Sequence, residues 1–201
     1  TPLGTDSGDR LWLSAFTVLT AEDLSAARFA AFMDSTRIDP EAVADALGKG
    51  WWTKDLSCAD FAAVWTTVIG KRRSPATLGS AIDALDQRLF KTKSLESELR
   101  ELASLVLFDF IPGGEFVNDP RTHHAELLAS ALAKVDSPRA AAVLDNWLST
   151  YLAMPRIGGS ALEHARGFIR SLMGTAPAAT LDALQRLAES DDWQGRCLEL
   201  R

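Results

Sequence analysis

The distribution of apolar and polar residues along this chain predicts an array of short helices. Apolar residues recur at helical spacing, for example at Leu78, Ile82, Leu85 and Leu89. The predicted helices begin near residues 9, 20, 39, 57, 74, 94, 119, 137, 160, 176 and 191. These starts lie about 18 residues apart, or about 36 per pair of helices, which is the range of helical-hairpin repeats. The sequence therefore predicts an all-α fold built as an array of helical hairpins.

Four of these helices are predicted to begin with a polar residue directly before a proline. The four pairs are Asp39-Pro40, Ser74-Pro75, Asp119-Pro120 and Ser137-Pro138. The polar side chain accepts a hydrogen bond from an N–H of the first helical turn. Proline costs nothing at the next position, because the backbone nitrogen is unpaired there in any case. These pairs predict where the helices start to within a residue or two.

Two stretches depart from the regular helical spacing. Residues 105–111 are apolar nearly throughout, which is typical of either a buried helix end or a short strand. We favour the helix, because no strand partner of comparable strength occurs elsewhere. Residues 111–118 contain Pro-Gly-Gly and form the most conspicuous loop. We therefore expect a flexible lead-in over residues 1–8, a helical N-terminal part over 9–110 and a second helical part over 119–201.

The second helical part resembles HEAT-type repeats. Residues 135–144 are similar to the opening of such a repeat, where a short Asp/Pro/Arg turn leads into the first helix of a pair. Three apolar positions then recur at an offset of 40 residues. The matched positions are Leu144 with Leu184, Trp147 with Leu187, and Leu148 with Ala188.

A second HEAT-like turn is found at residues 188–196. The resemblance implies that Asp192 and Arg196 hydrogen-bond across neighbouring turns, and that residues 119–201 form stacked helical pairs. Stacked pairs of this kind usually hold another macromolecule.

Composition narrows the class of protein. With 201 residues, of which 47% are hydrophobic, the chain is able to bury a substantial core. Its net charge of −6 gives no general attraction to nucleic acid or to an anionic membrane. No apolar run approaches the roughly 20 residues needed to span a bilayer, and no signal peptide is present. We expect a cytoplasmic protein without a membrane partner.

Two further features concern the cysteines and the chain ends. Cys58 and Cys197 lie far apart in no metal-ligand spacing, so two reduced thiols are favoured over one long-range disulfide. The sequence begins at Thr1 and stops at Arg201 within a predicted helix, which favours a segment of a longer protein.

Motifs of catalysis and cofactor binding are missing from the sequence. There is no Gly-x-Ser-x-Gly motif and no phosphate-binding glycine loop followed by Lys-Ser/Thr. His123 and His124 with Glu126 form the only local cluster with potential for metal binding or acid–base chemistry. Adjacent histidines on a helix point about 100° apart and so do not face one metal ion. We expect no enzymatic activity, no cofactor and no metal.

The most distinctive candidate site is a basic turn, Lys71-Arg72-Arg73-Ser74, before a predicted helix start. Exposed N–H groups, the Ser74 hydroxyl and three cations are suited to holding a phosphate. Arg88, Lys91 and Lys93 could extend this basic surface along the following helix. The alternative, which we favour, is a solvated turn that keeps the protein soluble.

A pair of tryptophans, Trp51 and Trp52, follows a glycine-marked helix end and is a candidate interface anchor, although packing of both into the core is the simpler interpretation. Taken with the helical array, these features favour a non-catalytic protein-interaction or scaffold module that binds a protein partner or an adjacent domain. Nucleic-acid binding through the basic residues of 71–93 is the alternative.

Overall fold

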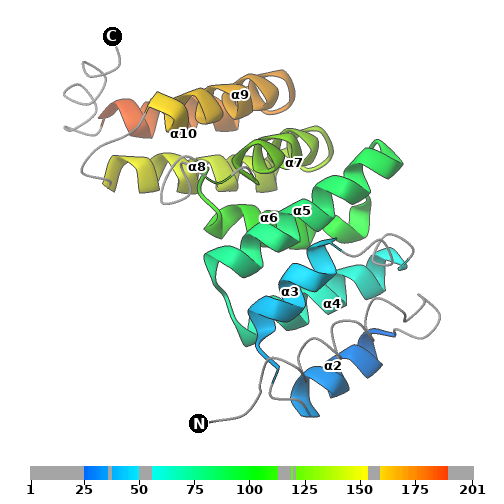
Figure 1. The fold of residues 1–201 in the computed structure, drawn as a ribbon. Coiled ribbons are helices and arrows are strands. Elements are labelled where there is room, and N and C mark those ends of the chain that lie inside the picture. The colour runs from blue at the N-terminus through cyan, green and yellow to red at the C-terminus, as the bar shows by residue number, and fades with distance from the viewer. Residues whose placement is uncertain are drawn as a thin grey trace. The chain divides into compact units, whose positions relative to one another are not determined.

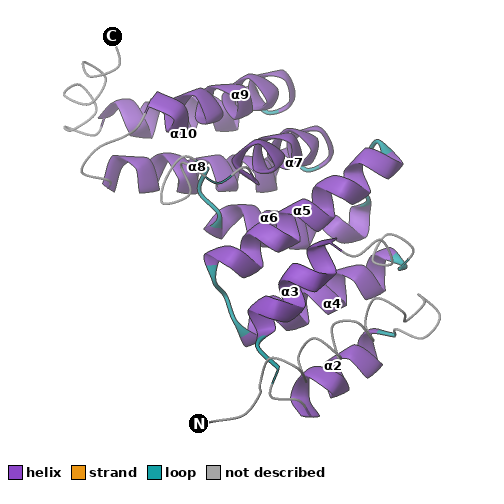
Figure 2. Cartoon of the chain, viewed as in Figure 1, coloured by secondary structure: helices purple, strands orange, loops and turns teal. Residues whose placement is uncertain are grey.

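The computed structural model describes residues 25–35, 38–49, 56–112, 119, 121–153 and 159–189. Every regular element within these ranges is a helix, and the helices pack against one another (Figure 2). The predicted all-α class is confirmed. The helix starts predicted near residues 9, 20 and 191 lie outside the described residues.

The chain divides into two compact units, Thr1–Arg88 and Leu89–Arg201. The division falls within helix α5 (Pro75–Thr92), so it does not follow the loop at residues 111–118 where the sequence placed the boundary between its two parts. Helix α6 (Arg100–Asp109) lies in the second unit, where it contacts both α7 and α8.

The first unit contains α2 (Ala26–Ser35), α3 (Pro40–Lys49), α4 (Cys58–Lys71) and α5 as far as Arg88 (Figure 1). Helix α4 contacts both α2 and α3 and buries an apolar stripe at helical spacing, Phe61, Val64, Trp65 and Val68.

The end of α3 packs closely on α5. The side-chain amide of Gln87 donates a hydrogen bond to the carbonyl oxygen of Gly48 at 3.0 Å. A Cβ atom added at Gly48 would lie only 3.0 Å from the backbone oxygen of Ser80. The absence of a side chain at Gly48 is therefore what allows the two helices to approach so closely.

The second unit contains the end of α5, a short 3₁₀ helix η2 (Ser97–Leu99), and helices α6 (Arg100–Asp109), α7 (Arg121–Val135), α8 (Ser137–Ala153), α9 (Gly159–Thr175) and α10 (Pro177–Glu189). From α6 onward each helix contacts the next helix and the one after it, so that α7 lies against α9 and α8 against α10 (Figure 1). One residue separates α7 from α8 and one separates α9 from α10, as expected for tight helical hairpins.

Most predicted helix starts are confirmed. The side chains of Asp39, Ser57, Ser74 and Asp119 each accept a hydrogen bond from a backbone N–H in the first turn of the helix that follows. Helices α9 and α10 begin within one residue of the positions that the sequence predicts. Capping depends on neighbouring residues only, which explains why the sequence locates these starts well.

The cap of α8 was assigned to the wrong residue. The helix begins at Ser137 itself, and the carboxylate of Asp136 accepts the hydrogen bond from the N–H of Arg139 at 3.3 Å. Asp136 also forms an ion pair with the Arg139 guanidinium at 2.8 Å. Two good capping residues stand side by side here, and the one with the additional charged partner is used.

The region before α6 also differs from the prediction of a helix start at Ser94. Helix α5 continues to Thr92, and the next residue, Lys93, has a left-handed φ of 63°. Residues 93–96 are then needed for the turn, and α6 begins only at Arg100 after the 3₁₀ helix. The apolar stretch 105–111 is helical through Asp109, as favoured, and continues in extended backbone at Phe110.

Candidate functional site

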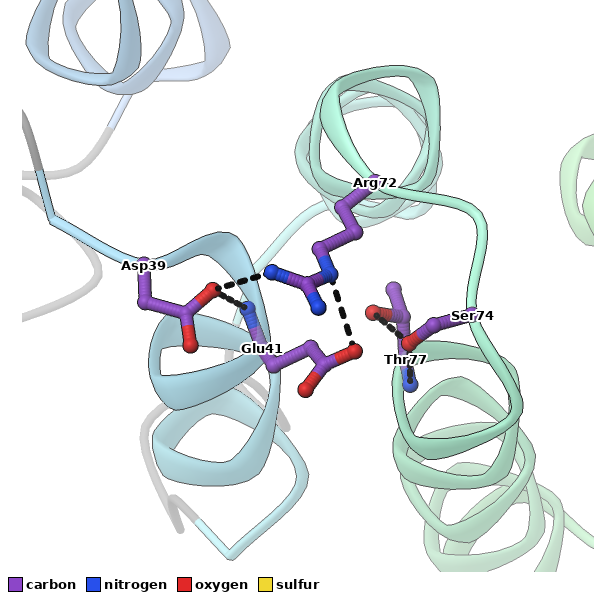
Figure 3. A network of polar contacts seen from close by, with 5 residues as sticks. All are labelled: Asp39, Glu41, Arg72, Ser74 and Thr77. Carbon is purple, nitrogen blue, oxygen red and sulfur yellow. Dashed lines mark hydrogen bonds and ion pairs between the residues drawn. The ribbon is translucent and has the colours of Figure 1, made fainter.

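The basic turn lies between the end of α4 and the start of α5, beside the N-terminus of α3 (Figure 3). Lys71 is the last residue of α4, and Arg72 caps the helix by donating its backbone N–H to the carbonyl oxygen of Val68 at 3.1 Å. Positive charge at a helix C-terminus complements the helix dipole. Before the N-terminus of α5 these cations would oppose the dipole of that helix, but at the C-terminus of α4 they complement the dipole.

Carboxylates from α2 and α3 pair with these cations. The Nζ atom of Lys71 lies 2.5 Å from Oδ1 of Asp34. The guanidinium of Arg72 reaches Glu41 through Nε at 3.0 Å and Asp39 through Nη1 at 3.4 Å (Figure 3). Asp39 accepts at the same time from the N–H of Glu41, so one carboxylate both caps α3 and binds Arg72.

The hydroxyl of Ser74 is occupied by the start of α5. Its Oγ accepts from the N–H of Thr77 at 3.2 Å and lies 3.1 Å from the Thr77 hydroxyl (Figure 3). A phosphate at this turn would have to compete with Thr77 for Ser74, and with Asp39 and Glu41 for Arg72. Arg73 is exposed and makes a contact of its own.

Arg88 is not part of the basic surface that the sequence predicted. It is only 7% exposed, and its guanidinium donates to the carbonyl oxygen of Leu56 at 2.9 Å and to Sγ of Cys58 at 3.1 Å. Its Cζ lies 5.1 Å from the centre of the Phe61 ring. The expectation that Arg88 extends an exposed patch is therefore corrected: this cation links α5 to the start of α4 within the core.

Lys91 and Lys93 lie at the other end of α5 from Ser74. An 18-residue helix is about 27 Å long, so these lysines do not share a turn with Lys71 and Arg72. The Nζ atom of Lys93 sits 3.9 Å from the centre of the Phe90 ring, and Phe90 is 76% exposed. Trp51, Trp52, Asp192 and Arg196 lie outside the described residues.

The chain matches no protein-family model, no curated protein and no solved structure. In the described ranges, no helix combines the length and the apolar character needed to cross a bilayer.

In the histidine cluster of α7, Nδ1 of His123 lies 3.5 Å from Oε2 of Glu126. The His123 and His124 rings are tilted by 52° with their centres 6.4 Å apart. Across residues 25–189, outside the undescribed gaps, no group of three or more His, Cys, Asp or Glu side chains is placed to hold a metal ion.

A set of polar contacts between α8 and the end of α6 was missed by the sequence analysis. Nε1 of Trp147 donates to the carbonyl oxygen of Leu107 at 2.7 Å, and the side-chain amide of Asn146 donates to that of Phe108. The Tyr151 hydroxyl donates to the carbonyl oxygen of Pro112. Burial, reinforced by the nearby Glu126 carboxylate, raises the pKa of this hydroxyl. The donors on Trp147 and Asn146 satisfy carbonyl groups that the end of α6 leaves unpaired.

A sequence signal for these contacts does exist. Trp147 and Tyr151 are four residues apart on one face of α8, and both carry a polar atom on a largely apolar ring. Trp147 also packs on Phe168 of α9, with ring centres 5.0 Å apart, so it joins three helices. In the sequence Trp147 was treated only as a recurring apolar position, and its N–H donor was overlooked.

Proposed function

We propose that this chain is a non-catalytic protein-interaction or scaffold module of a larger cytoplasmic protein, built in its C-terminal part from HEAT-like helical pairs. The observation that supports it most is the pattern of helix contacts from α6 to α10, in which each helix meets the next two. Arrays of stacked helical pairs present extended surfaces, and their common role is to hold another macromolecule.

The spacing of side-chain contacts in the second unit supports the same proposal. Hydrogen bonds join Trp147 to Leu107, 40 residues earlier, and Ser171 to Ser130, 41 residues earlier. An ion pair joins Arg186 to Asp145 across 41 residues. Contacts at a nearly constant separation are what a repeat of about 40 residues produces.

Affinity capture from the native extract tests this function. Full-length tagged chain is compared with a scrambled helical bait of the same composition, and bound proteins are quantified by mass spectrometry. We expect one protein or domain to be enriched with the native bait and to rebind when purified. Equal recovery with both baits would overturn the proposal.

Nucleic-acid binding through the basic residues of 71–93 is the weaker alternative. Lys71 and Arg72 are paired with three carboxylates, Arg88 is buried, and Lys91 and Lys93 lie at the far end of α5. A mobility-shift titration decides between the two, because phosphate contacts give an affinity that falls steeply with salt. We expect no shift at low salt, and a salt-sensitive complex would favour the alternative.

A further inference from the structure

Two contacts show which sides of α7 and α9 face each other. Oγ of Ser171 lies 3.0 Å from Oγ of Ser130, and a Cβ atom added at Gly167 would lie 3.6 Å from Oε1 of Glu126. Glu126 and Ser130 are one turn apart on α7, as Gly167 and Ser171 are on α9. Each pair therefore marks one stripe along its helix.

The α7 stripe also includes Ala129 and Ala133, which are 0% and 1% exposed. The four α7 positions recur 40 residues later on α9 as Arg166, Ile169, Arg170 and Met173. On α9 most of this stripe is open to solvent: Met173 is 40% exposed, Ile169 is partly exposed, and Arg170 is exposed. The surface that α9 covers on α7 thus has a counterpart on α9 that the described residues leave largely exposed at Arg170 and Met173.

Helix α10 shows the same relationship to α8. Asp145 of α8 faces α10, because its Oδ1 pairs with the Arg186 guanidinium at 2.8 Å. The position 40 residues later is Gln185, which is exposed. One turn before Gln185, Leu181 is 54% exposed, and the neighbouring Asp182 is exposed as well.

We define the outer face of the α9–α10 hairpin as Ile169, Arg170, Met173, Leu181, Asp182 and Gln185. Its apolar residues come from both helices, while its exposed charges differ in sign, with arginine on α9 and aspartate on α10. Burying exposed apolar area of this kind favours association.

We propose that the outer face is a self-association surface, on which a second copy of this chain packs its own outer face about a two-fold axis. Helices α9 and α10 are joined by the single residue Ala176 and run in opposite directions. An axis parallel to them lays α9 of each copy over α10 of the other. Met173 then meets the apolar region around Leu181 of the second copy.

Charge complementarity favours a second copy of the chain over a partner whose surface charges all have the same sign. Arg170 and Asp182 lie at equal distances along the chain from Ala176, six residues before it and six after it. In the two-fold arrangement each Arg170 faces the Asp182 of the other copy, and both pairs form at once. A uniformly acidic or basic partner would leave one of these charges facing its own sign, which is unfavourable.

The test measures the oligomeric state of the purified full chain by sedimentation equilibrium between about 1 and 200 µM. We expect a monomer–dimer equilibrium whose Kd rises at least about tenfold in Met173→Glu, Arg170→Glu and Asp182→Arg. The double variant Arg170→Glu/Asp182→Arg restores opposite charges across the interface and is expected to recover most of the affinity. Leu127→Glu, at a 44% exposed position on α7 outside the outer face, is the matched control and leaves Kd unchanged.

A chain that stays monomeric at the highest concentration would overturn the proposal. So would a dimer that is insensitive to Met173→Glu, or a double variant that associates no better than the single ones. The inference goes beyond the proposed function and needs only purified chain, so its failure leaves the capture of a different protein untouched.

Discussion

The indole N–H of Trp147 in α8 donates a hydrogen bond of 2.7 Å to the carbonyl oxygen of Leu107 in α6. Trp147 is fully buried, and Leu107 lies in the last turn of its helix, where carbonyl groups have no partner within the helix. The contact therefore satisfies two polar groups that would otherwise be buried without a hydrogen bond.

Trp147→Phe is expected to destabilise the protein by about 1 kcal/mol more than Trp65→Phe. Both tryptophans are fully buried, so both variants lose similar apolar volume. Nε1 of Trp65 has no hydrogen-bond partner among the described residues, whereas Trp147→Phe leaves the Leu107 carbonyl unpaired. Urea denaturation of the two variants measures the difference, and equal losses would contradict the role given to the Trp147 donor.

Gly48→Ala is expected to lower stability, although alanine normally favours a helix over glycine by up to about 1 kcal/mol. The new methyl group would lie 3.0 Å from the backbone oxygen of Ser80, which belongs to a helix and has little freedom to move. Gly70→Ala is the matched control in α4, because nothing lies within 4 Å of its added Cβ, and it should be neutral or stabilising. Thermal unfolding compares the two, and a stabilising Gly48→Ala would show that α3 and α5 are able to separate slightly.

Lys93→Gly is expected to stabilise the protein by about 0.5 kcal/mol. Relief of the left-handed backbone at Lys93 contributes about 1 kcal/mol, and loss of the ammonium contact with Phe90 offsets about half of it. Lys91→Gly lies within the last turn of α5 and should instead destabilise, because glycine is a poor helix former. Denaturant midpoints that move in the same direction for both variants would argue against this account.

Asp60 is expected to make stability sensitive to acid. Its carboxylate accepts from the Ser57 hydroxyl at 2.7 Å and from the N–H of Ala26 at 3.2 Å, and these bonds hold its pKa below the usual 3.8. A lowered folded-state pKa means that the stabilisation is complete above the unfolded pKa of about 3.9 and is lost as the pH falls through the folded value. Ser57→Ala removes the larger cause, so the pKa of Asp60 should rise toward 3.8 in a carboxyl NMR titration. An unchanged titration would show that Ser57 is not its main partner.

The features that the sequence predicted well are those determined by residues close by in the chain. The caps at Asp39, Ser57, Ser74 and Asp119 use atoms two or three residues away, so residue type and spacing locate them. At α8 two adjacent capping residues compete, and the Ser-Pro pattern pointed to Ser137 although Arg139, which pairs with Asp136, is only three residues further on.

Contacts between distant parts of the chain were harder to predict. Arg88 was grouped with surface lysines by its charge, yet it follows Ala81 by seven residues and Leu85 by three, which places it on the buried side of α5. The pairing of Lys71 and Arg72 with carboxylates more than 30 residues earlier required the positions of three helices. The candidate anion site therefore looked more open in the sequence than it is in the folded chain.

The three donors on α8 also fix the alignment of that helix against α6. Asn146 and Trp147 bond to successive carbonyl groups, and Tyr151 bonds to a third one just beyond the helix end. Apolar side chains are interchangeable enough for a packed helix to slide by a turn and find new contacts. Here such a slide would break all three hydrogen bonds together, so the two helices have a single register.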